Sequence, residues 1–287
     1  MRARYPDHDG FVQHEAVKIY FEVYGDGDTT VMLIPTWSLF HSRVWKMQIP
    51  YLSRHYRVIT YDPRGNGRSD RPRGVENHSW RHYIGDLLTV MDATETNRAI
   101  LVGLSFSGYW ANLCAVLHPD RVLGVVAIGP GAGLEIGLPE RMEHSYTDRL
   151  DTTEGWAKEN IHFIRSNYRD YVEFFVGKLF TEPHSTKAFE DGVDWAMETD
   201  AETLIATDTA DILPSDDMAS FYGGYTRPLM IIHGDEDAIV AHASSVELAR
   251  LTRGNLVTLR GSGHVPNVRD PVKVNLAIRD FIEKVAS

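Results

Sequence analysis

The chain is poor in the features that mark disulfide-stabilised, membrane-spanning and nucleic-acid-binding proteins. Its 287 residues include one cysteine, Cys114, which excludes a disulfide within the chain. No run of about 18 apolar residues occurs, so we expect no membrane-spanning helix. Acidic residues outnumber basic ones by 40 to 29, and no cluster of Lys and Arg indicates a nucleic-acid partner.

The remaining composition is that of an ordinary globular protein. Hydrophobic residues make up 43% of the chain and charged residues 24%, and the length suits one large domain or a domain with an insertion. The first twenty residues carry basic side chains but no apolar segment of the secretory type, so we expect a cytoplasmic protein. No group of His, Cys, Asp and Glu has the spacing of metal ligands, and we predict neither a metal nor a cofactor.

Short apolar segments alternate with helical patterns along most of the chain. This alternation predicts an α/β fold with a mostly parallel sheet covered by helices on both faces. Strands are expected at residues 10–14, 18–23, 31–34, 57–61, 98–103, 121–128, 228–234 and 255–260. Helices are expected at 45–54, 83–91, 109–117 and 272–285.

Residues 133–221 break this rhythm, since they contain no convincing buried strand between the sixth and seventh expected strands. Their helical stretches are expected at 154–166, 168–179 and 187–198. We therefore predict a helical cap over residues 133–221, inserted into a core formed by residues 1–132 and 222–287.

The negative charge of the chain belongs to this predicted cap. Residues 133–221 hold 20 acidic against 7 basic residues, a net charge of −13, whereas the rest of the chain holds 20 against 22, a net charge of +2. Such a charge excess usually indicates a well-solvated helical surface. The alternative is that the field of the cap discourages anionic substrates.

The most informative stretch is residues 100–110, ILVGLSFSGYW, in which an apolar run ends in a serine and a helical pattern follows. A serine between small residues at a strand-to-helix turn is what a nucleophile elbow requires, because its strained backbone excludes bulky neighbours. Ser107 stands where the G-x-S-x-G pattern has its second glycine. We predict that Ser105 is the nucleophile.

Two further residues follow in the order that this chemistry needs. Asp237 lies in an acidic loop just past the strand expected at 228–234, and His264 lies in a glycine-rich loop past the next strand. His264 would accept the proton of Ser105, and Asp237 would fix the histidine tautomer. Spacing alone leaves Asp235 and Glu236 open as the acid.

With these motifs the chain resembles the α/β-hydrolase superfamily, in particular its capped, esterase-like branch. The resemblance rests on residues 58–72, VITYDPRGNGRSDRP, on 233–240, HGDEDAIV, and on 261–271, GSGHVPNVRDP. The G-x-x-D pattern of that family, which begins here at Gly234, favours Asp237 as the acid. Some relatives place the acid after the preceding strand, where Glu135 stands, and His233 is the best competitor of His264.

The resemblance also implies where an oxyanion would be stabilised. One donor is the backbone N–H of Phe106, and the other comes from residues 35–38, PTWS, where relatives carry His-Gly. Proline has no N–H, so Trp37 is the natural second donor. The expected substrate-binding side chains are Trp37, Phe106, Tyr109, Trp156 and Trp195.

A serine at position 105 argues against dehalogenase and epoxide hydrolase activity, which the resemblance associates with an aspartate nucleophile. We predict a serine hydrolase that cleaves a carboxylic ester or lactone of a small to medium, neutral substrate through an acyl-enzyme. One alternative is a C–C bond hydrolase of a ketonic ring-cleavage product with the same triad. Another is a ligand sensor of the same fold with slow turnover. The expected partner is a small molecule, neither nucleic acid nor membrane, and the sequence does not indicate an oligomeric state.

Overall fold

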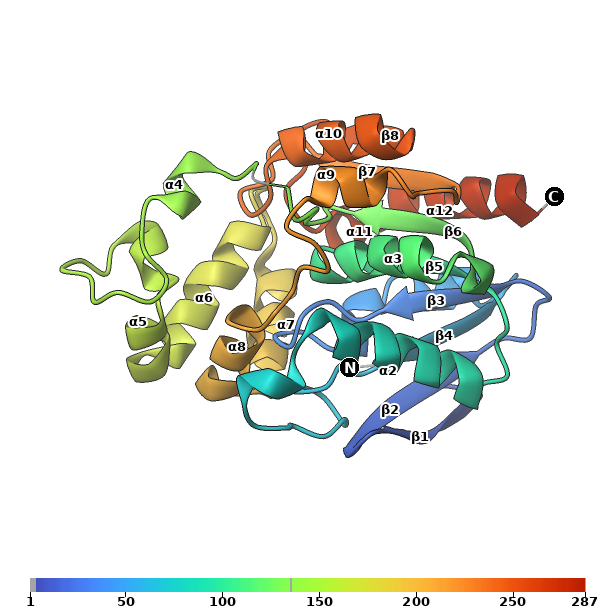
Figure 1. Ribbon diagram of the computed structural model, residues 1–287, viewed down its shortest axis with the longest axis horizontal. Coiled ribbons are helices and arrows are strands. Elements are labelled where there is room, and N and C mark those ends of the chain that lie inside the picture. The colour runs from blue at the N-terminus through green and yellow to red at the C-terminus, as the bar shows by residue number, and fades with distance from the viewer. Residues whose placement is uncertain (1–3, 135, 287) are drawn as a thin grey trace.

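The computed structural model describes residues 4–134 and 136–286, and an eight-stranded sheet runs through its centre (Figure 1). The strand order is β1-β2-β4-β3-β5-β6-β7-β8. The strands are β1 His8–His14, β2 Val17–Tyr24, β3 Thr30–Ile34, β4 Arg57–Tyr61, β5 Ala99–Leu104, β6 Val122–Ile128, β7 Leu229–Gly234 and β8 Asn255–Leu259. β2 pairs antiparallel with β1 and β4, and every pair from β4 to β8 is parallel.

The helices surround this sheet and extend beyond it. They are α1 Ile49–Leu52, α2 Trp80–Ala93, α3 Phe106–Leu117, α4 Pro139–Met142, α5 Ile161–Ser166, α6 Tyr168–Leu179, α7 Thr186–Ala196, α8 Ala201–Asp208, α9 Met218–Tyr222, α10 His242–Thr252, α11 Pro266–Arg269 and α12 Pro271–Ala286. Short 3-10 helices are η1 Ser42–Trp45, η2 Val75–Asn77, η3 Pro119–Arg121 and η4 Gly155–Lys158.

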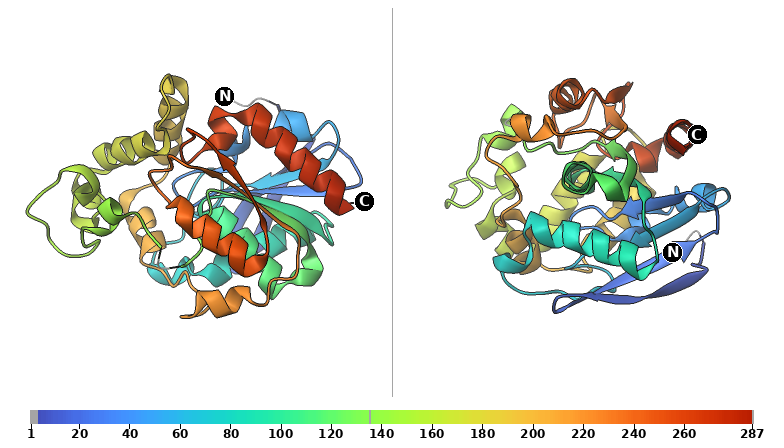
Figure 2. Two further views of the ribbon diagram at one scale, coloured as in Figure 1. Left: turned by 90° about the horizontal axis from the view of Figure 1, so that it is seen from above. Right: turned by 45° about the vertical axis from the view of Figure 1, so that its right-hand side comes forward.

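Two apolar layers hold the sheet between its helices. β3, β5 and β7 are buried along their whole length, as expected of parallel strands covered on both faces. On one face Leu87 of α2, Leu113 of α3 and Leu248 of α10 belong to one buried cluster. On the other face Leu52 of α1 and Ile278 of α12 belong to a second cluster, and Figure 2 shows α12 across the sheet from α3 and α10. The predicted fold class is confirmed.

The described residues between β6 and β7 contain helices α4 to α9 and no strand. Helices α5 to α8 lie together beside one end of the sheet, at the left of Figure 1. Close packing of α7 on α6 depends on Gly192, where an added Cβ would lie 2.9 Å from Val176 Cγ1. The expected cap boundary at residue 221 falls inside α9, whose Met218 and Tyr222 pack in the same cluster as α3 and α10.

Ion pairs join acids of this segment to bases of the sheet domain. Arg73 contacts Asp200 at 2.8 Å, Arg43 contacts Glu198 at 3.3 Å, and Lys46 contacts Asp191. Since these bases precede β5 in the chain and the acids follow α6, the pairs span two parts of the protein that are far apart in sequence. Part of the acidity of residues 133–221 therefore faces basic side chains of the core.

Two expected helices are shorter in the structure. The pattern over 45–54 predicted one helix, but the structure has η1 and the four-residue α1, because Pro50 in the first turn of α1 has no N–H to continue a helix from before it. The stretch 154–166 divides into η4 and α5, since the side chain of Asn160 accepts from His162 N and starts a new helix.

Within the described residues, no helix is long and apolar enough to cross a bilayer.

Candidate active site

Ser105 lies in the turn between β5 and α3 with a strained backbone, φ 56° and ψ −119°. The turn is tight, because a Cβ on Gly103 would lie 2.2 Å from the carbonyl oxygen of Ser107. Ser107 Oγ accepts from Leu104 N at 2.8 Å and donates to Leu104 O at 2.9 Å. The serine that replaces the usual glycine thus closes the turn with its own hydroxyl.

Asp237 and His264 meet in the loops that follow β7 and β8. His264 Nδ1 lies 2.7 Å from Asp237 Oδ2, and both side chains are almost fully buried. The other carboxylate oxygen accepts from the backbone N–H groups of Ile239 at 2.7 Å and Val240 at 3.0 Å. Because a carboxylate only accepts, His264 donates from Nδ1, and its Nε2 remains available as a base.

His233 contacts the same carboxylate oxygen as His264. Its Nε2 lies 3.0 Å from Asp237 Oδ2, and its Nδ1 lies 2.6 Å from Ser245 Oγ. Burial by itself would raise the pKa of Asp237, but the attraction and hydrogen bonds of His264 and His233 hold that pKa well below its usual range. Asp237 is therefore ionised throughout the neutral range.

The other acids considered for this role lie elsewhere or cannot be placed. Asp235 Oδ1 accepts from the backbone N–H of Gly261 at 2.6 Å, and the side chain of Glu236 is exposed. Glu135 lies outside the described residues. Among the described acids, Asp237 is the one that the structure brings to His264.

The two expected oxyanion donors lie beside each other. The rings of Trp37 and Phe106 stack with centroids 5.8 Å apart. The N–H of Phe106 is the first of α3, a position that has no acceptor inside the helix. Trp37 has a positive φ of 34°, which turns the backbone after β3 sharply. Pro35 has no N–H, so the backbone donors of residues 35–38 are those of Thr36, Trp37 and Ser38.

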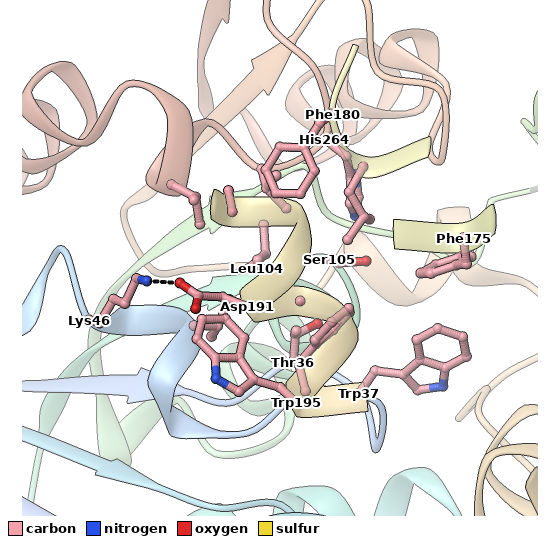
Figure 3. A pocket seen from close by; sticks show the side chains of 17 residues that line it. Thr36, Trp37, Lys46, Leu104, Ser105, Phe175, Phe180, Asp191, Trp195 and His264 are labelled. Atoms are coloured by element: carbon pink, nitrogen blue, oxygen red, sulfur yellow. Dashed lines mark hydrogen bonds and ion pairs between the residues drawn. The ribbon is translucent and has the colours of Figure 1, made fainter. Parts of the chain in front are cut away.

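Ser105 borders two cavities. One has a cavity volume of about 40 Å³, and we call it the histidine chamber. Its lining residues are Thr36, Trp37, Phe40, Val44, Lys46, Leu104, Ser105, Phe175, Leu179, Phe180, Ala188, Asp191, Gly192, Trp195, His264, Val265 and Val268 (Figure 3). The other, the tyrosine chamber, has a cavity volume of about 200 Å³. Its lining residues are Trp37, Ser105, Phe106, Tyr109, Gly131, Gly133, Arg141, Phe175, Ile212, Leu213, Ile239 and Val240.

Trp37 and Phe175 line both chambers, and their ring centroids are 5.2 Å apart. Phe106 and Tyr109 line the tyrosine chamber, and Trp195 lines the histidine chamber. The fifth expected substrate-binding residue, Trp156, lines neither.

Trp156 is turned toward other residues of the segment between β6 and β7. Its ring packs 5.2 Å from the ring of Phe174 and 5.2 Å from the guanidinium of Arg141. Because Arg141 lines the tyrosine chamber, Trp156 lies one residue behind that wall. The helical spacing of the sequence around Trp156 did not reveal which neighbours its ring would face.

A polar cluster borders a hollow next to the tyrosine chamber. Arg141 donates to both carboxylate oxygens of Glu159, at 2.5 and 2.7 Å, and Tyr146 Oη donates to Asp208 at 2.8 Å. Burial, with the nearby charge of Glu159, raises the pKa of Asp208 to about 8. Asp208 is therefore mostly protonated at neutral pH.

Comparison with known proteins places this geometry in context. A family model described as the alpha/beta hydrolase fold matches residues 29–271. The chain is 25% identical over 248 residues to a 2-hydroxy-6-oxo-2,4-heptadienoate hydrolase of Pseudomonas putida, covering 83% of this chain and 82% of that protein. It is 23% identical over 272 residues to a pimeloyl-acyl-carrier-protein methyl ester esterase of Yersinia enterocolitica, covering 93% and 98%. The crystal structure of an enol-lactonase from Burkholderia xenovorans matches with a TM-score of 0.78 at 22% identity, covering 96% and 100%.

Proposed function

Because this chain belongs to the family of the α/β-hydrolase fold, we propose that it is a serine hydrolase that cleaves carboxylic esters or lactones through an acyl-enzyme. The observation that carries the proposal is that Ser105 and His264 border one chamber, with Asp237 held 2.7 Å behind His264. A nucleophile, its base and the group that orients the base are the parts that acyl transfer needs.

Acylation begins when Ser105 Oγ attacks the carbonyl carbon and its proton passes to His264 Nε2. The carbonyl oxygen becomes an oxyanion, which the N–H groups of Trp37 and Phe106 stabilise. Each donor of this kind typically lowers the barrier by about 2.7–4 kcal/mol. The bond to the leaving oxygen then breaks, and that oxygen takes the proton from His264.

Deacylation uses the same groups with water in place of the leaving alcohol. Water gives a proton to His264 as it attacks the acyl carbon, and His264 returns a proton to Ser105 Oγ when the acid leaves. Asp237 stays ionised and stabilises the imidazolium that exists between these steps. The four contacts to its two oxygens support that role.

We further propose that residues 133–221 act as the cap over this site and select the substrate. α6 and α7 contribute Phe175, Leu179 and Trp195 to the histidine chamber. The walls of both chambers are mainly apolar, and this favours a small to medium, uncharged substrate.

Hydrolysis of a C–C bond is the second candidate, since one relative of this chain is named for a ketonic substrate. Such a substrate brings a carboxylate, and a free cation in the wall would suit it. The cations that line the two chambers, Lys46 and Arg141, are each paired with an acid, Asp191 and Glu159. This pairing favours the ester or lactone.

The test combines labelling with a substrate panel. A fluorophosphonate probe should label the protein at Ser105 and should leave the Ser105→Ala variant unlabelled. Purified protein should turn over p-nitrophenyl esters or lactones faster than a dienone acid. Label on another serine would overturn the triad, and a preference for the dienone acid would favour the C–C hydrolase. Tight ligand retention with slow turnover would instead identify a sensor.

A further inference from the structure

The wall of the histidine chamber contains one ion pair, which lies away from Ser105 and His264. Lys46 Nζ donates to Asp191 Oδ2, joining the segment after η1 to helix α7. Figure 3 shows these two side chains pointing at each other, on the side of the chamber away from Ser105 and His264. Apart from this pair, Ser105, His264 and Thr36, the residues that line the chamber are apolar or glycine.

The ammonium of Lys46 has more donors than this pair uses. A lysine ammonium carries three N–H donors, and Asp191 is its hydrogen-bond acceptor among the described residues. The Lys46 Nζ atom lies 5.4 Å from the centroid of the Trp195 ring, which offers a π face but no lone pair. The side chain of Lys46 is 23% exposed and borders the chamber on one side and a smaller hollow, lined by Ser42 and Arg43, on the other.

Asp191 keeps its negative charge at this place. Its second oxygen accepts from Lys187 Nζ at 2.5 Å, and Lys187 is 74% exposed and lies outside the chamber wall. Burial would raise the pKa of Asp191, but its bonds to Lys187 and Lys46 lower it. The chamber therefore presents a cationic donor and an anionic acceptor side by side.

This combination distinguishes three kinds of substrate arm. A purely apolar arm would displace water from Lys46 and leave its donors without acceptors, which costs free energy. A carboxylate would compete with Asp191 for Lys46 and could not donate to Asp191. A hydroxyl can accept from Lys46 and donate to Asp191, so it replaces the displaced water with two hydrogen bonds.

The chamber also indicates which side of the ester enters it. His264 must give its proton to the leaving oxygen, so that oxygen has to lie next to His264. Among the described residues, His264 lines this chamber and does not line the tyrosine chamber. The alcohol side of the ester therefore occupies the histidine chamber, and the acyl side occupies the tyrosine chamber.

We propose that the enzyme selects esters whose alcohol arm ends in an uncharged hydroxyl, a monoester of a diol, and that Lys46 determines this specificity together with Asp191. The proposal rests on the proposed function and narrows its substrate class. A site built to bond a hydroxyl discriminates strongly against the analogue that lacks one, because its buried polar groups then remain unpaired.

The experiment compares three matched acetates at each chain length from four to eight carbons. They are the monoacetate of the linear diol, the n-alkyl acetate and the ω-acetoxy carboxylate. The hydrolysis of each is measured in a pH-stat as the acetic acid that is released. At one chain length kcat/KM for the diol monoacetate should exceed that for the alkyl acetate by about tenfold or more. The carboxylate should be the poorest of the three.

Variants then assign the preference to the ion pair. In Lys46→Met, the ratio of kcat/KM for the diol monoacetate to kcat/KM for the alkyl acetate should fall close to one. Lys187→Met is the matched control, since it removes the other lysine of Asp191 from outside the chamber, and it should keep the wild-type ratio. A loss of the ratio in both variants would mean that the pair only ties α7 to the core.

The remaining outcomes also decide the matter. If the carboxylate is the best substrate, the chamber recognises an anion and the proposal is wrong. In the wild-type protein, kcat/KM could instead rise only with the hydrophobicity of the alcohol arm, so that no diol monoacetate exceeds its alkyl acetate. The proposal is then wrong, even where Lys46→Met does not fold. Failure of the proposed function looks different, because then no acetate is cleaved and the fluorophosphonate does not label Ser105.

Discussion

His233 and His264 contact the same oxygen of Asp237, at 3.0 and 2.7 Å, from two neighbouring strand ends. His233 is fully buried and its other ring nitrogen lies 2.6 Å from Ser245 Oγ, so a hydroxyl proton fixes its orientation. With Nδ1 accepting from Ser245, the N–H of Nε2 faces both Asp237 Oδ2, at 3.0 Å, and the carbonyl oxygen of Val240, at 3.2 Å. The carboxylate that orients His264 is thus itself held by a second imidazole.

This arrangement predicts a positioning role for His233. In His233→Phe the ring volume is kept but Asp237 loses one donor, and we expect kcat to fall by about tenfold. The pKa of Asp237 should rise, because burial then opposes its ionisation with one partner fewer. A variant that is less stable but keeps the wild-type kcat would show that His233 only packs.

Asp237 and Asp235 provide a matched test of the acid. Asp237→Asn should lower kcat by a factor on the order of 10⁴ without unfolding the chain, if the group behaves like the acid of other serine triads. Asp235→Asn should have a small effect, because Asp235 bonds the backbone of Gly261 and not a histidine. Steady-state kinetics with one p-nitrophenyl ester suffices. Severe loss in Asp235→Asn with a mild effect of Asp237→Asn would contradict the triad.

Gly103 should be intolerant of any side chain. In Gly103→Ala the new Cβ meets the Ser107 carbonyl at 2.2 Å, so the elbow has to shift. We expect a loss of about 1–3 kcal/mol in the free energy of unfolding, with loss of fluorophosphonate labelling. Gly177→Ala is the control, because Gly177 is exposed on helix α6 and its new Cβ would come no closer than 3.9 Å to Phe189 Cε2 of α7. That substitution should leave stability equal or higher.

Asp208 predicts a dependence of stability on pH. Its pKa is raised to about 8 in the folded chain, so between about pH 4 and pH 8 the folded state holds a proton that the unfolded state has lost. The free energy of unfolding should therefore fall as pH rises through this range, by at most about 1.4 kcal/mol per pH unit from this group. Asp208→Asn, which keeps an acceptor for Tyr146, should flatten the slope in urea titrations at pH 5 to 8. Equal slopes in both proteins would contradict the raised pKa.

The sequence predicted those parts of the molecule that depend on local rules. The apolar strands and the small residues around Ser105 follow from backbone geometry within a few residues, and the sequence located both. Asp237 followed from the family pattern, although spacing alone left Asp235 open. Lys46 could not be assigned, because its role depends on where α7 brings Asp191, and no local pattern fixes the packing of two distant segments. Trp156 was misplaced for the same reason, since helical spacing does not identify the neighbour that a ring will face.

The acidity of residues 133–221 allows a last prediction about charge near the two chambers. Acids paired with bases outside this segment, such as Asp200 with Arg73 at 2.8 Å, contribute little field. Glu140 and Glu143 form no ion pair within the described part of the chain, and they lie near Arg141 in sequence. We expect kcat/KM for a neutral ester to exceed that for an analogue with a carboxylate near the scissile bond. Added salt should narrow this difference, because screening acts over about 8 Å at physiological ionic strength.

The measurement compares both esters at low and high ionic strength. An ester pair that differs only in that carboxylate isolates the charge from size and reactivity. A preference for the anionic analogue, or a ratio that salt does not change, would refute the electrostatic role of the cap. The negative charge of residues 133–221 would then serve to keep the surface solvated and to pair α7 and α8 with bases of the core, as Asp191 and Asp200 do.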